Sequence, residues 1–76
     1  MMNEEPKPDP TVLKELFTTI MPYGKYKGFK IKDIPVHYLE WIERQGFPDG
    51  RLGMLLSTAH VIKTNQLEYL FKYIQT

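Results

Sequence analysis

Residues 21–35, MPYGKYKGFKIKDIP, decide the predicted fold class of this chain. Gly24 and Gly28 indicate a turn, because glycine readily takes the positive φ angles that many turns require. After the turn, residues 29–32 alternate between apolar and charged side chains, which is typical of a strand. A β-branched run before Pro22 is typical of a partner strand. The stretch therefore predicts a hairpin with strands at 18–22 and 29–32 and a loop at 23–28.

Four amphipathic segments surround the predicted hairpin, and each has apolar residues at helical spacing. The first begins where Asp9 can cap a helix and Pro10 suits the first helical position. The second follows Pro35 and ends at Gly46, a residue type that often terminates helices. The predicted helices cover residues 10–17, 36–45, 50–64 and 66–74. We therefore expect an α+β fold, in which a short two-stranded hairpin packs against about four helices.

The second half of the chain supplies most of the predicted core. Asp49 is expected to cap the third helix after a tight connection that ends at Gly50. Asn65 is expected to end the third helix by taking a left-handed conformation before the fourth. Gly53 inside the third helix costs about 1 kcal/mol relative to alanine, which indicates that another segment approaches closely there. Because a lone hairpin is marginal in water, it must lean on Trp41 and the helices. Trp41 and Tyr38 could form an aromatic recognition surface, but we expect both in the core. The other side chains expected there are Leu39, Ile42, Leu52, Leu55, Leu56, Ala59 and Ile62.

Length and composition limit the chain to one small domain. Its 76 residues, 42% of them hydrophobic, suit a single modest core. The absence of cysteine excludes disulfides, zinc–thiolate sites and thiol nucleophiles. The apolar runs are far shorter than the roughly 20 residues that span a bilayer. Residues 1–9 are acidic and proline-rich, unlike a signal peptide, and predict a disordered tail. We therefore expect a cytoplasmic protein with one domain at residues 10–76.

The net charge of +1 conceals a basic segment at residues 23–32, which contains four lysines and no acid. Lysines on a glycine-bounded loop can meet phosphates, and exposed rings between them can stack on unpaired bases. The competing interpretation is a solvated hairpin whose rings pack inward and whose lysines only aid solubility. The predicted nucleic-acid-binding residues are Tyr23, Lys25, Tyr26, Lys27, Lys30 and Lys32.

The sequence contains no pattern of a catalytic or metal site. Gly24 and Gly28 do not form a P-loop, because a predicted strand follows them instead of Lys-Ser/Thr and a helix. His37 and His60 are the only histidines and lack the spacing of a metal-binding pair. Ser57 lies within a predicted helix, without the strained turn of a nucleophile. The aspartates that a metal-dependent nuclease would need to cluster are scattered, at Asp9, Asp33 and Asp49. We therefore expect no enzyme activity and no cofactor.

Several motifs resemble those of a known bacterial family. They are MPYGKYKG at 21–28, DIP at 33–35 with YLEW at 38–41, GFPDGRLGMLL at 46–56 and IKTNQLEYLF at 62–71. This pattern is similar to the small family of putative quorum-sensing-regulated virulence factors, and the resemblance covers about residues 20–72. Tyr23 stands where the family often has phenylalanine, and Gln66 stands where glycine is usual. The break before the last predicted helix must therefore rest on Asn65.

The front half of the chain also resembles an accessory module at the C-terminus of some bacterial exonucleases of the exodeoxyribonuclease X and proofreading type. By analogy, this resemblance implies an association with nucleic acid. We therefore expect a non-enzymatic module that binds DNA or RNA weakly and in a salt-sensitive way through the basic segment. We expect neither a membrane as a partner nor a small-molecule cofactor.

Two other hypotheses compete with nucleic-acid binding. The first is a protein-interaction adaptor linked to virulence or regulation, which would bind a partner protein or a second copy of the chain. Its binding surface would be the hairpin or an exposed flank formed by Met54, Tyr69 and Tyr73. The second is a small enzyme, for example a metal-dependent nuclease that uses Asp33, which the scattered carboxylates disfavour.

Overall fold

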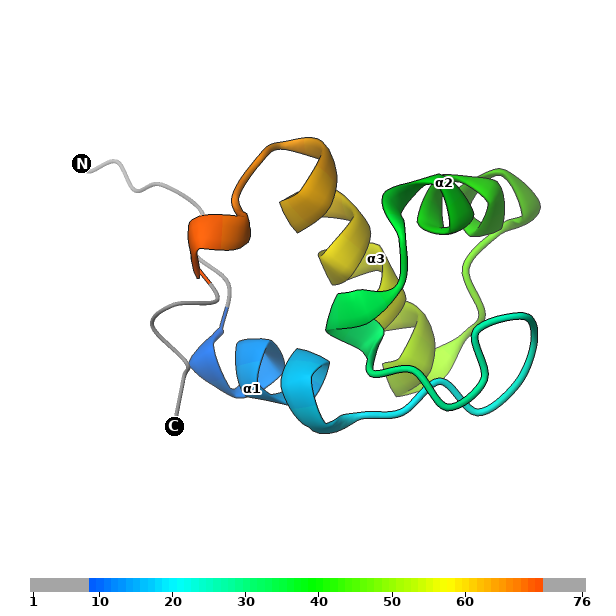
Figure 1. Ribbon diagram of the computed structural model, residues 1–76, viewed down its shortest axis with the longest axis horizontal. Helices are drawn as coiled ribbons and strands as arrows, with labels where there is room; N and C mark the ends of the chain where they lie inside the picture. The colour runs from blue at the N-terminus through cyan, green and yellow to red at the C-terminus, as the bar shows by residue number, and fades with distance from the viewer. Residues whose placement is uncertain (1–8, 71–76) are drawn as a thin grey trace.

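The computed structural model describes residues 9–70, which form three α-helices and a short 3-10 helix (Figure 1). The elements are α1 (Pro10–Thr18), η1 (Ile31–Asp33), α2 (Val36–Gln45) and α3 (Gly50–Thr64). The second and third predicted helices are confirmed with their bounds, and the first ends one residue later than predicted. Residues 68–70 of the predicted fourth helix form a 3-10 turn. The rest of that helix and residues 1–8 of the predicted tail lie outside the described residues.

The predicted α+β class is wrong, because the described residues contain three helices and no β-strand. An isolated antiparallel bridge between Ile20 and Lys30 is all that residues 9–70 contain of the predicted hairpin. The first arm is short because α1 continues through Thr18 and Pro22 has no N–H to donate. The second arm is short because residues 31–33 turn into η1. Arms of this length cannot extend into a ladder.

Backbone hydrogen bonds nevertheless close the loop at its base. The Met21 N–H donates to the Phe29 carbonyl at 2.8 Å, and the Gly28 N–H donates to the Met21 carbonyl at 2.9 Å. The predicted positive φ angles of the loop glycines are confirmed, at 83° for Gly24 and 93° for Gly28. Buried side chains on both sides of the loop fix it to the core, namely Met21, Ile31 and Ile34.

Helix α3 is central to the fold because it packs against α1, α2 and η1 (Figure 1). Its predicted apolar stripe is buried, apart from the half-buried Leu52. The opposing helices contribute two buried side chains each, since Leu13 and Leu16 of α1 and Leu39 and Ile42 of α2 face this core. The buried α3 side chains are Leu55, Leu56, Ala59 and Ile62.

The connection between α2 and α3 lies directly on α3. A Cβ atom at Gly53 would lie 1.6 Å from the Pro48 carbonyl oxygen, so the predicted close approach is confirmed. Asp9 caps α1 as predicted, through a 2.8 Å bond from the Thr11 N–H. Asp49 precedes α3, but its side chain makes no capping bond, which corrects the prediction at that helix.

The break after α3 lies one residue later than predicted. Asn65 has a φ of −107°, and Gln66 takes the positive φ, at 58°. The Leu67 N–H then donates to the Ile62 carbonyl at 2.8 Å, which is the six-residue bond of a Schellman motif. Asn65 acts instead through its side-chain amide, which donates to the Val61 carbonyl at 2.9 Å. Gln66 therefore adopts a conformation that glycine adopts with less strain.

An ion pair joins α1 to the start of α3. The Arg51 guanidinium donates to both carboxylate oxygens of Glu15, at 2.8 and 2.6 Å. This hydrogen bonding, more than the charge attraction, lowers the pKa of the Glu15 carboxyl below its ordinary value. Both side chains are in contact with solvent, so the pair orients the two helices while the core supplies most of the stability.

Candidate functional site

A row of four aromatic side chains, called the aromatic row below, joins the basic segment to α2. The ring centroids of Phe29 and Tyr26 are 5.1 Å apart, and those of Tyr26 and Tyr38 are 4.8 Å apart, both edge to face. Tyr38 then stacks on Trp41, with 5.6 Å between centroids and 26° between planes. Such pairs contribute about 0.5–1.5 kcal/mol each beyond the area they bury. The aromatic row therefore holds the loop against α2.

Trp41 lies at the surface, with 47% of its area exposed, so its predicted place in the core is wrong. The reason is its angular position on α2. At about 100° per residue, Trp41 lies about 100° around the helix from buried Ile42 and about 160° from buried Leu39. That spacing was the signal that could have placed it correctly. Tyr38 lies between Trp41 and Ile42 around the helix axis and is half-buried.

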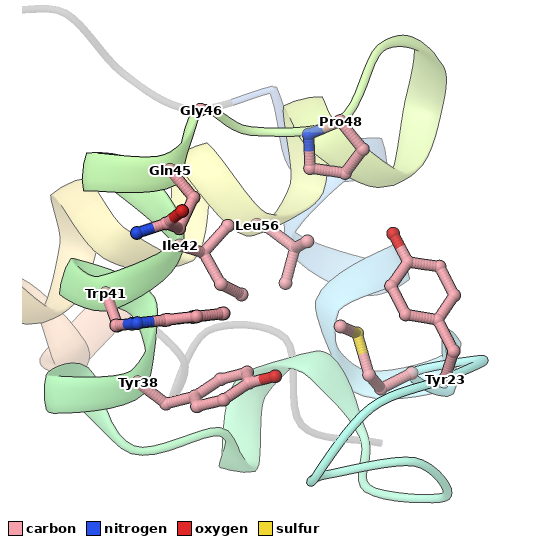
Figure 2. Close-up of a pocket in the computed structure, with 9 residues that line it drawn as sticks. Tyr23, Tyr38, Trp41, Ile42, Gln45, Gly46, Pro48 and Leu56 are labelled. Atoms are coloured by element: carbon pink, nitrogen blue, oxygen red, sulfur yellow. The ribbon is translucent and has the colours of Figure 1, made fainter.

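A cavity of about 200 Å³, called the pocket below, opens beside Trp41 (Figure 2). Tyr38 and Trp41 of α2 stand on one side, and Tyr23 of the basic segment stands on the other. Ile42 and Leu56 lie between them and give the pocket an apolar interior. Gln45 above Trp41 and Pro48 above Tyr23 complete the rim in this view. Of these residues, the sequence predicted a binding role only for Tyr23.

Three of the predicted lysines, Lys25, Lys27 and Lys30, are exposed. None of them forms an ion pair with another residue in the range 9–70. The Lys25 ammonium lies 5.8 Å from the ring centroid of Tyr26, which keeps it next to the aromatic row. An exposed ammonium without an acidic partner keeps its charge available for an anion, so these lysines are the best-placed cations of the segment.

The remaining predicted residues differ in their surroundings. Lys32 pairs with Asp33 at 2.8 Å and lies 5.3 Å from the ring centroid of Phe17, so its charge is partly neutralised. Tyr26 is half-buried within the aromatic row, and its ring supports the loop. Tyr23 is 51% exposed and lines the pocket. The structure thus brings Tyr23 together with Trp41 at the pocket and sets Lys32 apart.

The other proposed surfaces and sites receive less support from the geometry. Met54 is half-buried and packs against the core, Tyr69 is exposed, and Tyr73 lies outside the described residues. Within the described range, no three histidine, aspartate or glutamate side chains gather closely enough to hold a metal ion. In the same range, no helix has the length and apolar character needed to cross a membrane.

These features define a small helical domain that carries an aromatic pocket beside a basic loop. The chain belongs to the family described as putative quorum-sensing-regulated virulence factor, whose model matches residues 9–74. It is similar to "Uncharacterized protein YpeB" of Escherichia coli K12, with 48% identity over 59 residues, which are 76% of this chain and 82% of that protein. The protein of the same name from Escherichia coli O157:H7 is similar to the same extent. No solved structure matches the chain. The predicted family is therefore confirmed.

Proposed function

We propose that this chain is a non-enzymatic module that binds nucleic acid, DNA or RNA, in single-stranded form through the basic segment. The observation that carries the proposal is the presence of three exposed lysines in one short segment, none of which forms an ion pair within residues 9–70. The same segment carries the exposed ring of Tyr23, and the aromatic row connects it to the exposed ring of Trp41. Lysines that contact phosphates release counterions and so favour binding. Exposed rings stack on any base whose face is free, and unpaired bases offer such faces.

Two further considerations support the proposal. The aromatic row and the backbone bonds at the loop base hold the lysines in place before a ligand arrives, which reduces the ordering that binding would require. The resemblance of the front half to the exodeoxyribonuclease X accessory module points in the same direction by analogy. A nucleic-acid ligand also agrees with the cytoplasmic location that the sequence predicts.

The salt dependence of binding tests the proposal. We would titrate the full chain with a labelled single-stranded oligonucleotide and follow fluorescence anisotropy at increasing salt concentrations. Three phosphate contacts predict a slope of about −2 for log K against log salt, because each contact to a single strand contributes about −0.7. Replacing Lys25, Lys27 or Lys30 by alanine should reduce the slope by about 0.7 each.

A matched control separates the basic segment from the general surface. Lys14 is exposed on α1, outside the segment, and Lys14→Ala should leave both affinity and slope unchanged. The proposal fails if the wild-type chain does not bind at low salt. It also fails if the double variant Lys25→Ala/Lys27→Ala binds as well as wild type. A protein partner retained by that double variant would instead favour the adaptor hypothesis.

A further inference from the structure

The pocket has the size and walls expected for a single planar ring. Its volume of about 200 Å³ is below the roughly 300–1,000 Å³ of typical ligand sites, which suits one ring of a larger ligand. Trp41 stacks on Tyr38 but keeps 47% of its surface exposed, and Tyr23 opposite is 51% exposed. Aromatic surface is therefore available on two sides of an apolar interior (Figure 2). This arrangement suits a flat ligand with apolar faces.

The rim of the pocket carries polar groups that an aliphatic ligand would not use. The side-chain amide of Gln45 and the hydroxyl of Tyr23 make no hydrogen bond to another residue within 9–70. Gln45 lies above the edge of Trp41 (Figure 2). An amide both donates and accepts hydrogen bonds, which matches the mixed edge of a nucleobase. A ligand with flat faces and a polar edge uses the walls and the rim together.

The cations near the pocket lie on the side of Tyr23. Among the described residues, no charged side chain lines the pocket itself. Lys25 follows Tyr23 by two residues, and Lys27 and Lys30 are exposed in the same segment. On α2, Arg44 and Glu40 lie about 40° apart at 100° per residue, so a carboxylate accompanies the cation of that wall. The phosphates of a strand whose base enters the pocket would therefore meet cations on the Tyr23 side.

We infer that the pocket holds one unpaired base of the bound strand, between Trp41 and Tyr23, while Lys25, Lys27 and Lys30 contact the flanking phosphates. This inference rests on the proposed function and specifies how its ligand is held. A paired base cannot enter, because both of its faces are covered by stacking and its edge by pairing. The inference therefore predicts a preference for single strands over duplexes.

Two oligonucleotides with the same phosphates test the inference. One is a thymidine oligomer, and the other is an abasic oligomer of equal length and charge. Stacking of one base predicts that wild type binds the thymidine oligomer roughly 5- to 100-fold more tightly. Trp41→Ala should lower the affinity for the thymidine oligomer to about that for the abasic oligomer, and Trp41→Phe should keep most of the preference. Trp41 is the only tryptophan, so quenching of its fluorescence by the thymidine oligomer reports stacking directly.

The outcomes distinguish the inference from the proposed function. Tyr69 is exposed and does not line the pocket, so Tyr69→Ala is the matched control and should keep the preference. If wild type binds both oligomers equally, or Trp41→Ala keeps the full preference, the pocket inference is wrong while lysine-dependent binding stands. If neither oligomer binds at low salt, both proposals fail. Circular dichroism verifies the fold of each variant, and Tyr23→Ala replaces Trp41→Ala if that variant does not fold.

Discussion

The loop at residues 24–28 and the segment at 46–53, which comprises the α2–α3 connection and the first turn of α3, are both rich in glycine. Their glycines meet different physical needs. A Cβ atom at Gly28 would find nothing within 4 Å, and the residue is required only for its φ of 93°. Gly53 has an ordinary helical position, and a Cβ atom there would lie 1.6 Å from the Pro48 carbonyl oxygen. Gly28 therefore sets a conformation, and Gly53 leaves space for a neighbouring segment.

This difference separates the part of the molecule that forms the fold from the part that carries the candidate site. Residues 46–49 lie on the first turn of α3, and α3 contributes five buried residues to the core. The basic segment is held by backbone bonds at its base and by ring contacts at the surface. Regions with few buried contacts open more easily, and binding residues are often found on them. Substitutions in the two regions should therefore affect stability and binding differently.

Gly53→Ala should have the largest effect on stability. The added methyl group overlaps a backbone carbonyl, which cannot rotate away as a side chain would, so we expect a loss of about 3 kcal/mol or more. For a domain of this size, that loss lowers the melting temperature by roughly 10 °C or more. Thermal and urea unfolding measure it, with Ser57→Ala one turn further along α3 as a nearly neutral control. A loss below about 1 kcal/mol would show that the connection can move away from α3.

Gly28→Ala should have a smaller effect on stability and a clear effect on binding. An L-residue with a positive φ costs about 1–2 kcal/mol, and no steric overlap adds to this cost. The strained loop should then displace the neighbouring lysines and weaken oligonucleotide binding. Gly28→Asn is the matched control, because asparagine tolerates this region of φ better than alanine does. Equal losses for both variants would contradict an origin in backbone conformation.

The helices were predictable because local signals specify them. Apolar spacing, Pro35 and Gly46 bound α2 correctly, since each acts within a few residues of its position. The absence of the hairpin could not be predicted from the sequence. Four alternating residues do not show that α1 runs to Thr18 or that residues 31–33 form η1. The resemblance identified the family and the usual glycine at position 66, but it did not show that Gln66 takes the positive φ itself.

The candidate site was predictable only in part. The basic segment is continuous in the sequence, so its charge and its exposed lysines could be anticipated. The pocket could not, because Tyr23, Trp41 and Leu56 come from three segments that only the tertiary fold brings together. The apolar character of Trp41 favours the core, but its angle on α2 places it away from the buried face. Local patterns thus predict elements, and distant contacts decide where a surface forms.

Gln66→Gly extends the comparison to a positive φ outside both regions. Glycine relieves the strain of the 58° φ at this position, so we expect a gain in stability of about 0.5–1 kcal/mol. The gain is partly offset by the greater freedom of glycine in the unfolded chain. Asn65→Gly is the control, because Asn65 has a negative φ and its amide bonds to Val61, and this variant should be less stable. Urea unfolding shows whether each variant has a higher or a lower free energy of unfolding than wild type.

The smallest expected effect concerns an ion pair in contact with solvent, because water screens its charges. Arg51 belongs to this pair, whereas Lys25 pairs with no carboxylate within residues 9–70. The hydrogen bonds from Arg51 hold the pKa of Glu15 below its ordinary value of 4.5, so the unfolded chain takes up this proton at a higher pH than the folded chain. The stability that Glu15 contributes is therefore complete above pH 4.5 and is lost as the pH falls through its lowered pKa. Urea unfolding between about pH 6 and pH 3 should show this loss in wild type.

Arg51→Gln should flatten this part of the pH profile, because Glu15 then has nearly the same pKa in both states. Lys25→Gln should leave the profile unchanged, because Lys25 pairs with no described carboxylate. If Lys25→Gln altered the profile as Arg51→Gln does, the lysine would be bound to an acid of the protein. The charge that the proposed function assigns to phosphates would then already be neutralised within the fold.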